Sequence, residues 1–188
     1  MTSRRWVAVL VPLLLAGCAY PPMAPPPPSV ALVDRIAAAG LPAIAVGAFV
    51  PAPALPRAAD RGLGVRAVTI KPEGGSFARH LGDTLAAQLR VAGKLDPTSP
   101  VSVSGLLTEN DVSSGIGKGH GVLGAEFVVT RAGREVFRKR LRSERDWNSP
   151  FVGAVAIMNA DTEYGALYTE LIGRLIDDPD FRAAVRGG

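Results

Sequence analysis

The sequence predicts a single α+β domain, in which two helices cover one face of a mixed, mainly antiparallel sheet made of a three-strand meander and an N-terminal strand. Three stretches between residues 101 and 147 alternate apolar and polar side chains, as antiparallel strands buried on one face do. Two others, 77–92 and 161–176, have apolar residues at three-to-four spacing, which is typical of amphipathic helices. The roughly 160 residues after the N-terminal region suit one domain.

The elements before the first long helix are short. Residues 30–39 are Ala-rich and predict a helix that a glycine and a proline end. Residues 43–50 form an apolar, weakly alternating run, which predicts a first, mostly buried strand. The prolines that follow cannot donate to a sheet. We therefore expect a loop over 52–64 and then a short strand over 65–71.

The two long helices differ in how clearly they are bounded. Ser76 is a good N-cap for the first, and Gly93 ends it. His80 lies beside its apolar stripe with neither an acid nor a cysteine at metal-ligand spacing, so we expect a partly buried or surface histidine. The second helix follows an apolar segment, 151–158, and the sequence leaves open whether the two form one helix.

The meander is predicted over residues 101–109, 122–131 and 134–147, with a glycine turn in its last hairpin. In the third strand, apolar side chains point to one face: Phe137, Leu141 and Trp147. Charged side chains point to the opposite, solvated face: Arg138, Arg140, Arg142, Glu144 and Asp146.

The stretch from Ser113 to Gly121, Ser-Ser-Gly-Ile-Gly-Lys-Gly-His-Gly, is the one most suggestive of catalysis. A phosphate-binding loop needs Gly-Lys followed by Ser or Thr and a helix, whereas Gly119 follows Lys118 and the next element is a predicted strand. A flexible glycine-rich connection between two antiparallel strands explains the pattern better. On such a loop, Lys118 and His120 could touch an anionic partner such as lipid headgroups.

The basic residues Arg138, Arg140 and Arg142 are most simply part of the solvated face, and contact with a protein partner or with phospholipid is the alternative. The Gly-x-Ser-x-Gly spacing of a hydrolase nucleophile does not occur. The chain has two histidines and one cysteine, so it lacks the clusters that hold metals. We therefore predict no catalytic residue, no metal site and no cofactor.

Residues 1–17 have the pattern of a secretory signal: two arginines, an apolar run and small residues at the end. The run of roughly 10 residues is short for a transmembrane helix, which needs about 20. Its last residues, Leu15-Ala16-Gly17-Cys18, resemble a bacterial lipobox. This resemblance implies cleavage before Cys18, diacylglycerol on its thiol and an acyl chain on the new amino terminus.

Cleavage would remove Arg4 and Arg5, which lowers the Lys and Arg count from 21 to 19, against 17 acids. The remaining chain is close to charge-balanced, so the high pI is no sign of nucleic-acid binding. Three acyl chains exceed the two signals that stable anchoring requires. Enterobacterial lipoproteins kept at the inner membrane have Asp after the cysteine. Ala19 in that place implies, by resemblance, the periplasmic face of the outer membrane.

Residues 18–29 would form the lipidated cysteine and a tether, and residues 30–188 a single periplasmic domain. The tether is rich in proline, which favours extended polyproline II. At about 3.1 Å per residue, it could hold the domain roughly 30 Å from the lipid surface. The alternative is that this segment is a proline-rich ligand for an aromatic groove.

The order strand, helix, three-strand meander and helix, over roughly 43–176 and behind Leu15-Ala16-Gly17-Cys18, resembles a group of small Gram-negative envelope lipoproteins. The group includes the YajG-like proteins, the auxiliary lipoproteins of lipid-transport ABC systems and the lipopolysaccharide-assembly lipoprotein. The resemblance implies an α+β sandwich and a non-catalytic binding or accessory subunit with an envelope protein as partner. No motif here matches a binding motif of the group, so no binding residue is carried over.

Two other functions remain open. An envelope hydrolase acting on a cell-wall or lipid substrate would need a polar cleft that joins His80 or His120 to a serine or an acid. A lipid carrier would need an apolar groove between sheet and helices. We expect the helices over 77–92 and 164–176 to close the sheet face and to leave no such groove.

Replacing the predicted attachment residue, Cys18→Ser, should abolish fatty-acid labelling and leave an uncleaved precursor, because the resemblance to a lipobox makes Cys18 both the acylated residue and the residue before which the chain is cut. Metabolic labelling with a radioactive or clickable fatty acid, followed by mass determination, measures both. Labelling that persists in the variant would contradict the lipid anchor.

Overall fold

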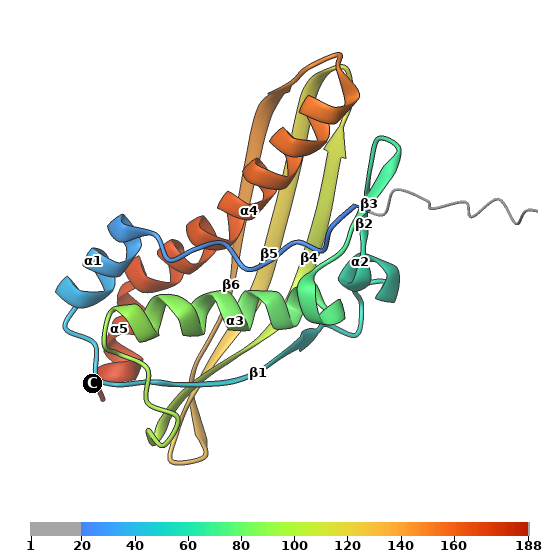
Figure 1. The fold of residues 1–188 in the computed structure, drawn as a ribbon. Helices are drawn as coiled ribbons and strands as arrows, with labels where there is room; N and C mark the ends of the chain where they lie inside the picture. The colour runs from blue at the N-terminus through green and yellow to red at the C-terminus, as the bar shows by residue number, and fades with distance from the viewer. Residues whose placement is uncertain (1–19, 188) are drawn as a thin grey trace, which may run out of the picture.

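The computed structural model describes residues 20–187, and a four-stranded sheet lies at its centre (Figure 1). The strands lie in the order β1–β4–β5–β6, with β1 parallel to β4 and the other neighbours antiparallel. Their bounds are Ala45–Pro51, Val101–Ser114, Gly117–Arg131 and Arg134–Ser149. The predicted α+β class, with a meander and an N-terminal strand in one mainly antiparallel sheet, is confirmed.

Helices cover one face of this sheet. Helix α3 (Phe77–Val91) lies over β1 and β4, and α4 (Gly153–Asp177) runs along β4, β5 and β6 (Figure 1). The shorter α1 (Val30–Ala38) packs on α3 and α4, and α5 (Pro179–Arg186) packs on β5 and β6 near their turn. The core therefore lies between the sheet and the helices, and the other face of the sheet is left to solvent.

The segment between β1 and α3 differs from the prediction of a loop and one strand. It contains helix α2 (Arg57–Arg61), the hairpin strands β2 (Leu63–Val65) and β3 (Val68–Ile70), and the 3-10 turn η1 (Glu73–Gly75). Arg66 forms the hairpin turn with Ala67 and has a φ of 55°. The turn lacks the glycine or asparagine that normally signals a positive φ, so the sequence run resembles a single strand.

The sequence left open whether the apolar segment 151–158 and the second long helix are continuous, and helix α4 joins them. It is one helix of 25 residues and continues without a break through residues 159–161. Buried residues recur at three-to-four spacing from Ala156 to Ile176. Packing along the whole sheet thus holds the helix together where its sequence has few helix signals of its own.

The glycine-rich stretch at residues 113–121 is not the flexible loop that we predicted. β4 continues to Ser114 and β5 begins at Gly117, so only a two-residue turn separates the strands. A Cβ on Gly119 would lie 2.0 Å from Nε1 of Trp147, and a Cβ on Gly121 would lie 3.2 Å from Cζ3 of the same ring. The glycines are strand residues that make room for the buried indole of Trp147.

The described part of the predicted tether, residues 20–29, is extended but does not stand away from the domain. Met23 is buried, and its N–H donates to Lys71 O (2.8 Å) while its carbonyl accepts from Glu73 N (2.8 Å). Ser29 N donates to Gln88 Oε1 on α3 (3.1 Å). We call residues 20–29 the strap. The predicted spacing of roughly 30 Å is wrong for this segment, because a methionine among the prolines pairs with the domain.

The substitution Gly119→Ala should destabilise the fold by about 1–3 kcal/mol, because the new methyl group overlaps the buried Trp147 ring. Gly64→Ala is the matched control: no atom lies within 4 Å of its Cβ position, and we expect a change within about 0.5 kcal/mol. Urea unfolding of the two variants measures the difference. Equal stabilities would show that the Trp147 ring moves freely.

Candidate functional site

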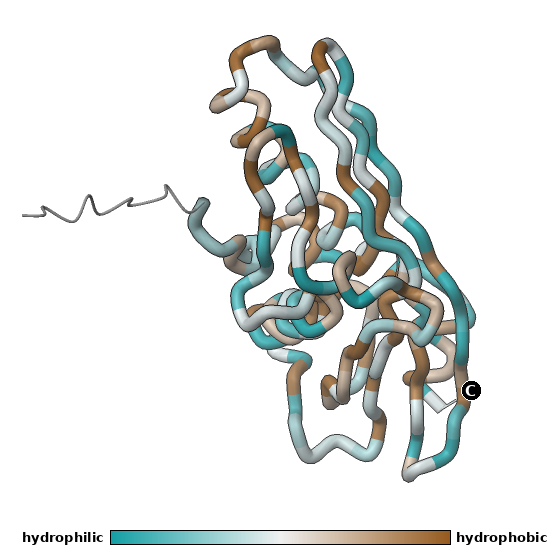
Figure 2. The backbone as a smooth tube through the Cα atoms, turned by 90° about the vertical axis from the view of Figure 1, so that its right-hand side faces the viewer, coloured by the Kyte–Doolittle hydropathy of each residue, from teal (hydrophilic) through white to brown (hydrophobic). Residues whose placement is uncertain are grey.

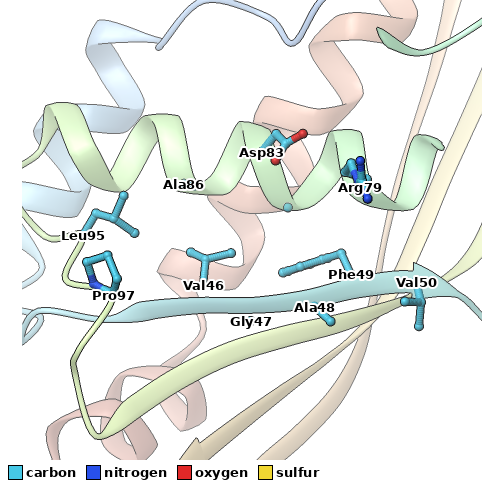
Figure 3. Close-up of a pocket in the computed structure, with 11 residues that line it drawn as sticks. Val46, Gly47, Ala48, Phe49, Val50, Arg79, Asp83, Ala86, Leu95 and Pro97 are labelled. Carbon is cyan, nitrogen blue, oxygen red and sulfur yellow. The ribbon is translucent and has the colours of Figure 1, made fainter. Parts of the chain in front are cut away.

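A groove of about 630 Å³ lies at the edge of the sheet, between β1 and α3 (Figure 3). Val46 and Phe49 point from β1 toward α3 and form its floor, and Leu95 lies at one end. Arg79 and Asp83 stand on the α3 side. The prediction that the helices leave no apolar groove is therefore wrong, because the outer side of β1, which pairs with no further described strand, is left open beside α3.

Two glycines set the position of the Phe49 ring on the groove floor. A Cβ on Gly82 of α3 would lie 2.8 Å from the ring, and a Cβ on Gly105 of β4 would lie 2.5 Å from it. On its inner side the ring meets Phe127 edge to face, with centroids 6.1 Å apart. The floor is thus a rigid aromatic surface. A phenylalanine opposite glycines on two different elements gives no local sequence signal, so sequence reasoning missed it.

The two charged groups of the groove are placed by the start of α3. Asp60 of α2 accepts hydrogen bonds from Ala78 N (2.9 Å) and Ser76 Oγ (3.1 Å), and Ser76 caps the helix by accepting from Arg79 N (3.2 Å). The Ser76 cap is as predicted. Arg79 and Asp83, one helical turn apart, are exposed, and neither forms an ion pair within residues 20–187. Both charges remain available to a bound molecule.

His80, which we expected to be partly buried or on the surface, is fully buried beside the groove helix. Its ring lies 4.7 Å from that of Tyr168, and neither ring nitrogen has a hydrogen-bond partner. Burial lowers the pKa of His80 to about 4, so the ring is neutral near pH 7. It packs as an aromatic core residue and cannot serve as a general base from this position.

A short polar chain lies next to His80 in the core. The hydroxyls of Tyr168 and Tyr164 are 2.8 Å apart, and Tyr164 donates to Asn110 Oδ1. Asn110 Nδ2 in turn donates to Ala59 O (2.6 Å). Burial raises the pKa of both tyrosines. Asn110 reaches this position because a bulge near residue 108 shifts the alternation of β4, which the sequence does not announce.

His120 and Lys118 lie on the exposed face of the sheet, on β5. His120 Nδ1 is 2.7 Å from Asp146 Oδ1, and Lys118 Nζ is 3.3 Å from Asp146 Oδ2. The hydrogen bond with His120 lowers the pKa of Asp146. His120 thus has the acid that the hydrolase hypothesis requires. However, His120 and Asp146 lie on the exposed face of the strands. The second ring nitrogen of His120, Nε2, is 3.5 Å from Oε1 of another acid, Glu144.

Arg138, Arg140 and Arg142 of β6 are exposed, and each of these three is matched by a carboxylate. Arg138 pairs with Glu126 and with Glu135 (2.6 Å), and Arg140 pairs with Glu126 (3.1 Å). Arg142 pairs with Glu109 (2.9 Å) and with Glu144. The hydrogen bonds from Arg138 and Arg140 lower the pKa of Glu126. The basic run of the sequence is therefore not a basic surface in the fold, because acids from β4, β5 and β6 neutralise it.

The predicted signal, residues 1–17, and Cys18 lie outside the described residues. Among residues 20–187, no helix has both the length and the apolar character needed to cross a bilayer. Within the same range, no three His, Cys, Asp or Glu side chains come together as a metal site would require.

No family model and no curated protein matches this chain. Among solved structures, the Xanthomonas campestris protein XCC0632, of family DUF330, is similar with a TM-score of 0.52 and 15% identity, over 81% of this chain and 93% of that one. A candidate lipoprotein from Caulobacter crescentus has a TM-score of 0.45 and 11% identity, over 57% and 85% of the two chains. Protein CT253 from Chlamydia trachomatis has a TM-score of 0.44 and 11% identity, over 79% of this chain and 100% of that one. The likeness to XCC0632 shows the fold alone.

The stability of the folded domain should decrease as the pH is lowered from about 6.5 to about 4, in part because of His80. In this window the unfolded chain binds the His80 proton and the folded chain does not, so protonation favours unfolding. The difference in pKa corresponds to roughly 3 kcal/mol at the acid end. Urea unfolding of His80→Leu and the native chain between pH 4 and 7.5 isolates this contribution. Parallel stability curves would contradict the neutral, buried His80.

Proposed function

We propose that this chain is a lipid-anchored protein of the bacterial cell envelope, held at the periplasmic face of the outer membrane by an acylated Cys18. It acts as a non-catalytic binding or accessory subunit of an envelope assembly or lipid-transport system. The observation that carries the binding role is the groove beside the open edge of β1, which suits an extended segment of an envelope protein.

The edge of β1 can accept a further strand. β1 pairs with β4 on one side, and no other described strand of this sheet pairs with its second edge. The segment at Leu95 bridges Ile44 just before β1, so the open edge spans Ala45–Pro51. An added peptide would place alternate side chains on the helix side of the sheet, and these would enter the groove.

The lining of the groove defines the chemistry of such a segment. Its floor of Val46, Phe49 and Leu95 favours apolar side chains at alternate positions. Arg79 and Asp83 lie one helical turn apart on the rim and favour a partner with both a basic and an acidic group. The preferred partner is thus an extended segment in which apolar and charged residues alternate.

The non-catalytic role rests on the positions of the two histidines. His80 is neutral and enclosed in the core, and the hydrogen bond of His120 goes to Asp146 on an exposed face crossed by ion pairs. A general base must reach the proton of a bound substrate, and neither histidine lines the groove.

A photo-crosslinking amino acid at position 50, on the open edge strand β1 beside the groove, should form adducts with one segment of an envelope protein in living cells. The same residue at position 136, on the opposite edge strand β6, should not; Val50 and Val136 are comparably exposed, at 46% and 39%. Asp83→Lys should reduce the adduct at position 50 by roughly tenfold if one rim charge is worth about 1.4 kcal/mol.

Mass spectrometry of the crosslinked peptides identifies the segment. Equal labelling at positions 50 and 136 would contradict a specific site at β1. Adducts with lipid acyl chains at position 50 would assign the groove to lipid carriage in place of peptide binding.

A further inference from the structure

Five large apolar side chains gather at one end of the molecule, exposed to solvent. They are Ile116, Phe151, Val152, Val155 and Met158, and we call this group the apolar tip. Phe151 is 78% exposed, Ile116 69% and Met158 63%. The tip is the upper end in Figure 1, where the β4–β5 turn meets the start of α4, and Figure 2 shows hydrophobic segments there.

The fold holds the two parts of the apolar tip together. Gly117 at the start of β5 pairs with Ser149 at the end of β6, so the turn that carries Ile116 lies beside the chain leading to Phe151. Arg66, from the turn of the β2–β3 hairpin, donates to Gly115 O (2.7 Å) and to Pro150 O (3.1 Å). The tip is therefore a built surface and not a pair of independent loops.

The start of α4 has the opposite pattern to a surface helix in water. Val152, Val155 and Met158 recur at three-residue spacing on the exposed side, whereas the buried side carries the small residues Ala156 and Ala160. A helix packed on a sheet normally places polar residues on its outer side. From residue 147 to residue 160 the sequence has no charged residue. A contiguous exposed apolar surface of this kind indicates a contact with a partner or a membrane.

The position of the strap favours a membrane. Tyr20, the first described residue, lies with Asp161 and Thr162 of α4 around one cavity. Cys18 precedes Tyr20 by two residues, so it lies no more than about 7 Å farther along the chain. Met158 lies three residues before Asp161, which is about 4.5 Å along the helix axis. A lipid on Cys18 would thus enter its bilayer within roughly 20 Å of the α4 part of the tip.

Two cations flank the apolar tip. Arg66 is exposed and has no carboxylate partner among the described residues, and Lys118 is largely exposed although it pairs with Asp146. Basic groups next to apolar side chains suit the boundary between headgroups and acyl chains, where the apolar face of a surface-bound helix lies about 5–10 Å deep.

We propose that the apolar tip is a membrane-contact surface, which enters the interfacial layer of the leaflet that holds the Cys18 lipid and fixes the orientation of the domain. The assignment rests on the proposed lipid anchor. It adds a second, protein-borne contact that no lipobox predicts.

Fluorescence quenching by lipids tests the proposal. The full-length protein, acylated in its host, carries a cysteine at position 151 or 30 labelled with an environment-sensitive dye. It is placed in phosphatidylethanolamine–phosphatidylglycerol vesicles with brominated acyl chains. Val30, on α1, is the matched control because it is 77% exposed, against 78% for Phe151. The dye at 151 should shift to shorter wavelength and be quenched, and the dye at 30 should not.

The outcomes separate the two proposals. A chain that does not float with the vesicles would overturn the lipid anchor, and with it the assignment of the tip. A chain that floats with position 151 unquenched, or quenched no more than position 30, would overturn the tip alone. A blue shift at 151 that depends on the number of chains per vesicle, with no effect of bromine, would indicate contact with a second copy and would also overturn the tip.

Discussion

The structure depends on a difference in polarity between the two faces of the sheet: one face of β6 and its neighbours is apolar, and the other is charged. Apolar side chains such as Phe127 and Phe137 must leave water on one face, and α3, α4 and α5 pack there to cover them. The sheet is long and the helices lie on one side of it only, so the positions of the groove and the apolar tip follow from where this helix cover begins and ends. The groove lies where helix cover ends at β1, and the apolar tip lies where α4 begins.

The exposed face of the sheet is held near neutrality by ion pairs that cross the strands. Glu126 receives two arginines, and Asp146 receives both His120 and Lys118. Exposed pairs of this kind contribute little to stability, on the order of 0–1 kcal/mol each, and they weaken with salt. Their main effect is on recognition, because the matched arginines of β6 offer little to an anionic partner. Arg79, Asp83 and Arg66, which have no ion-pair partner among residues 20–187, lie away from this face, at the groove and the tip.

The sequence predicted what depends on periodicity and local signals: the meander, the Ser76 cap and both long helices. It did not predict features that depend on residues distant in the chain. The glycines at 119 and 121 suggested a mobile loop, since only the fold reveals that Trp147 fills the space above them. His80 lies beside the apolar stripe of its helix, so the sequence predicted partial burial. Its full burial follows from packing against Tyr168 on a different helix. The groove was missed because helix periodicity does not indicate how far a helix extends over a sheet edge.

The buried Met23 has a consequence for how the domain moves. A free polyproline segment would leave the domain able to rotate widely about its point of attachment. The N–H and the carbonyl oxygen of Met23 both bond to the domain, so the fold holds the chain five residues after Cys18 and not only at the end of the predicted tether. For a chain acylated at Cys18, the β1 edge then has a narrower range of heights above the bilayer than a free tether over residues 18–29 would allow. Partners embedded in the same bilayer would meet it by two-dimensional diffusion, at a high effective concentration, so that weak contacts suffice.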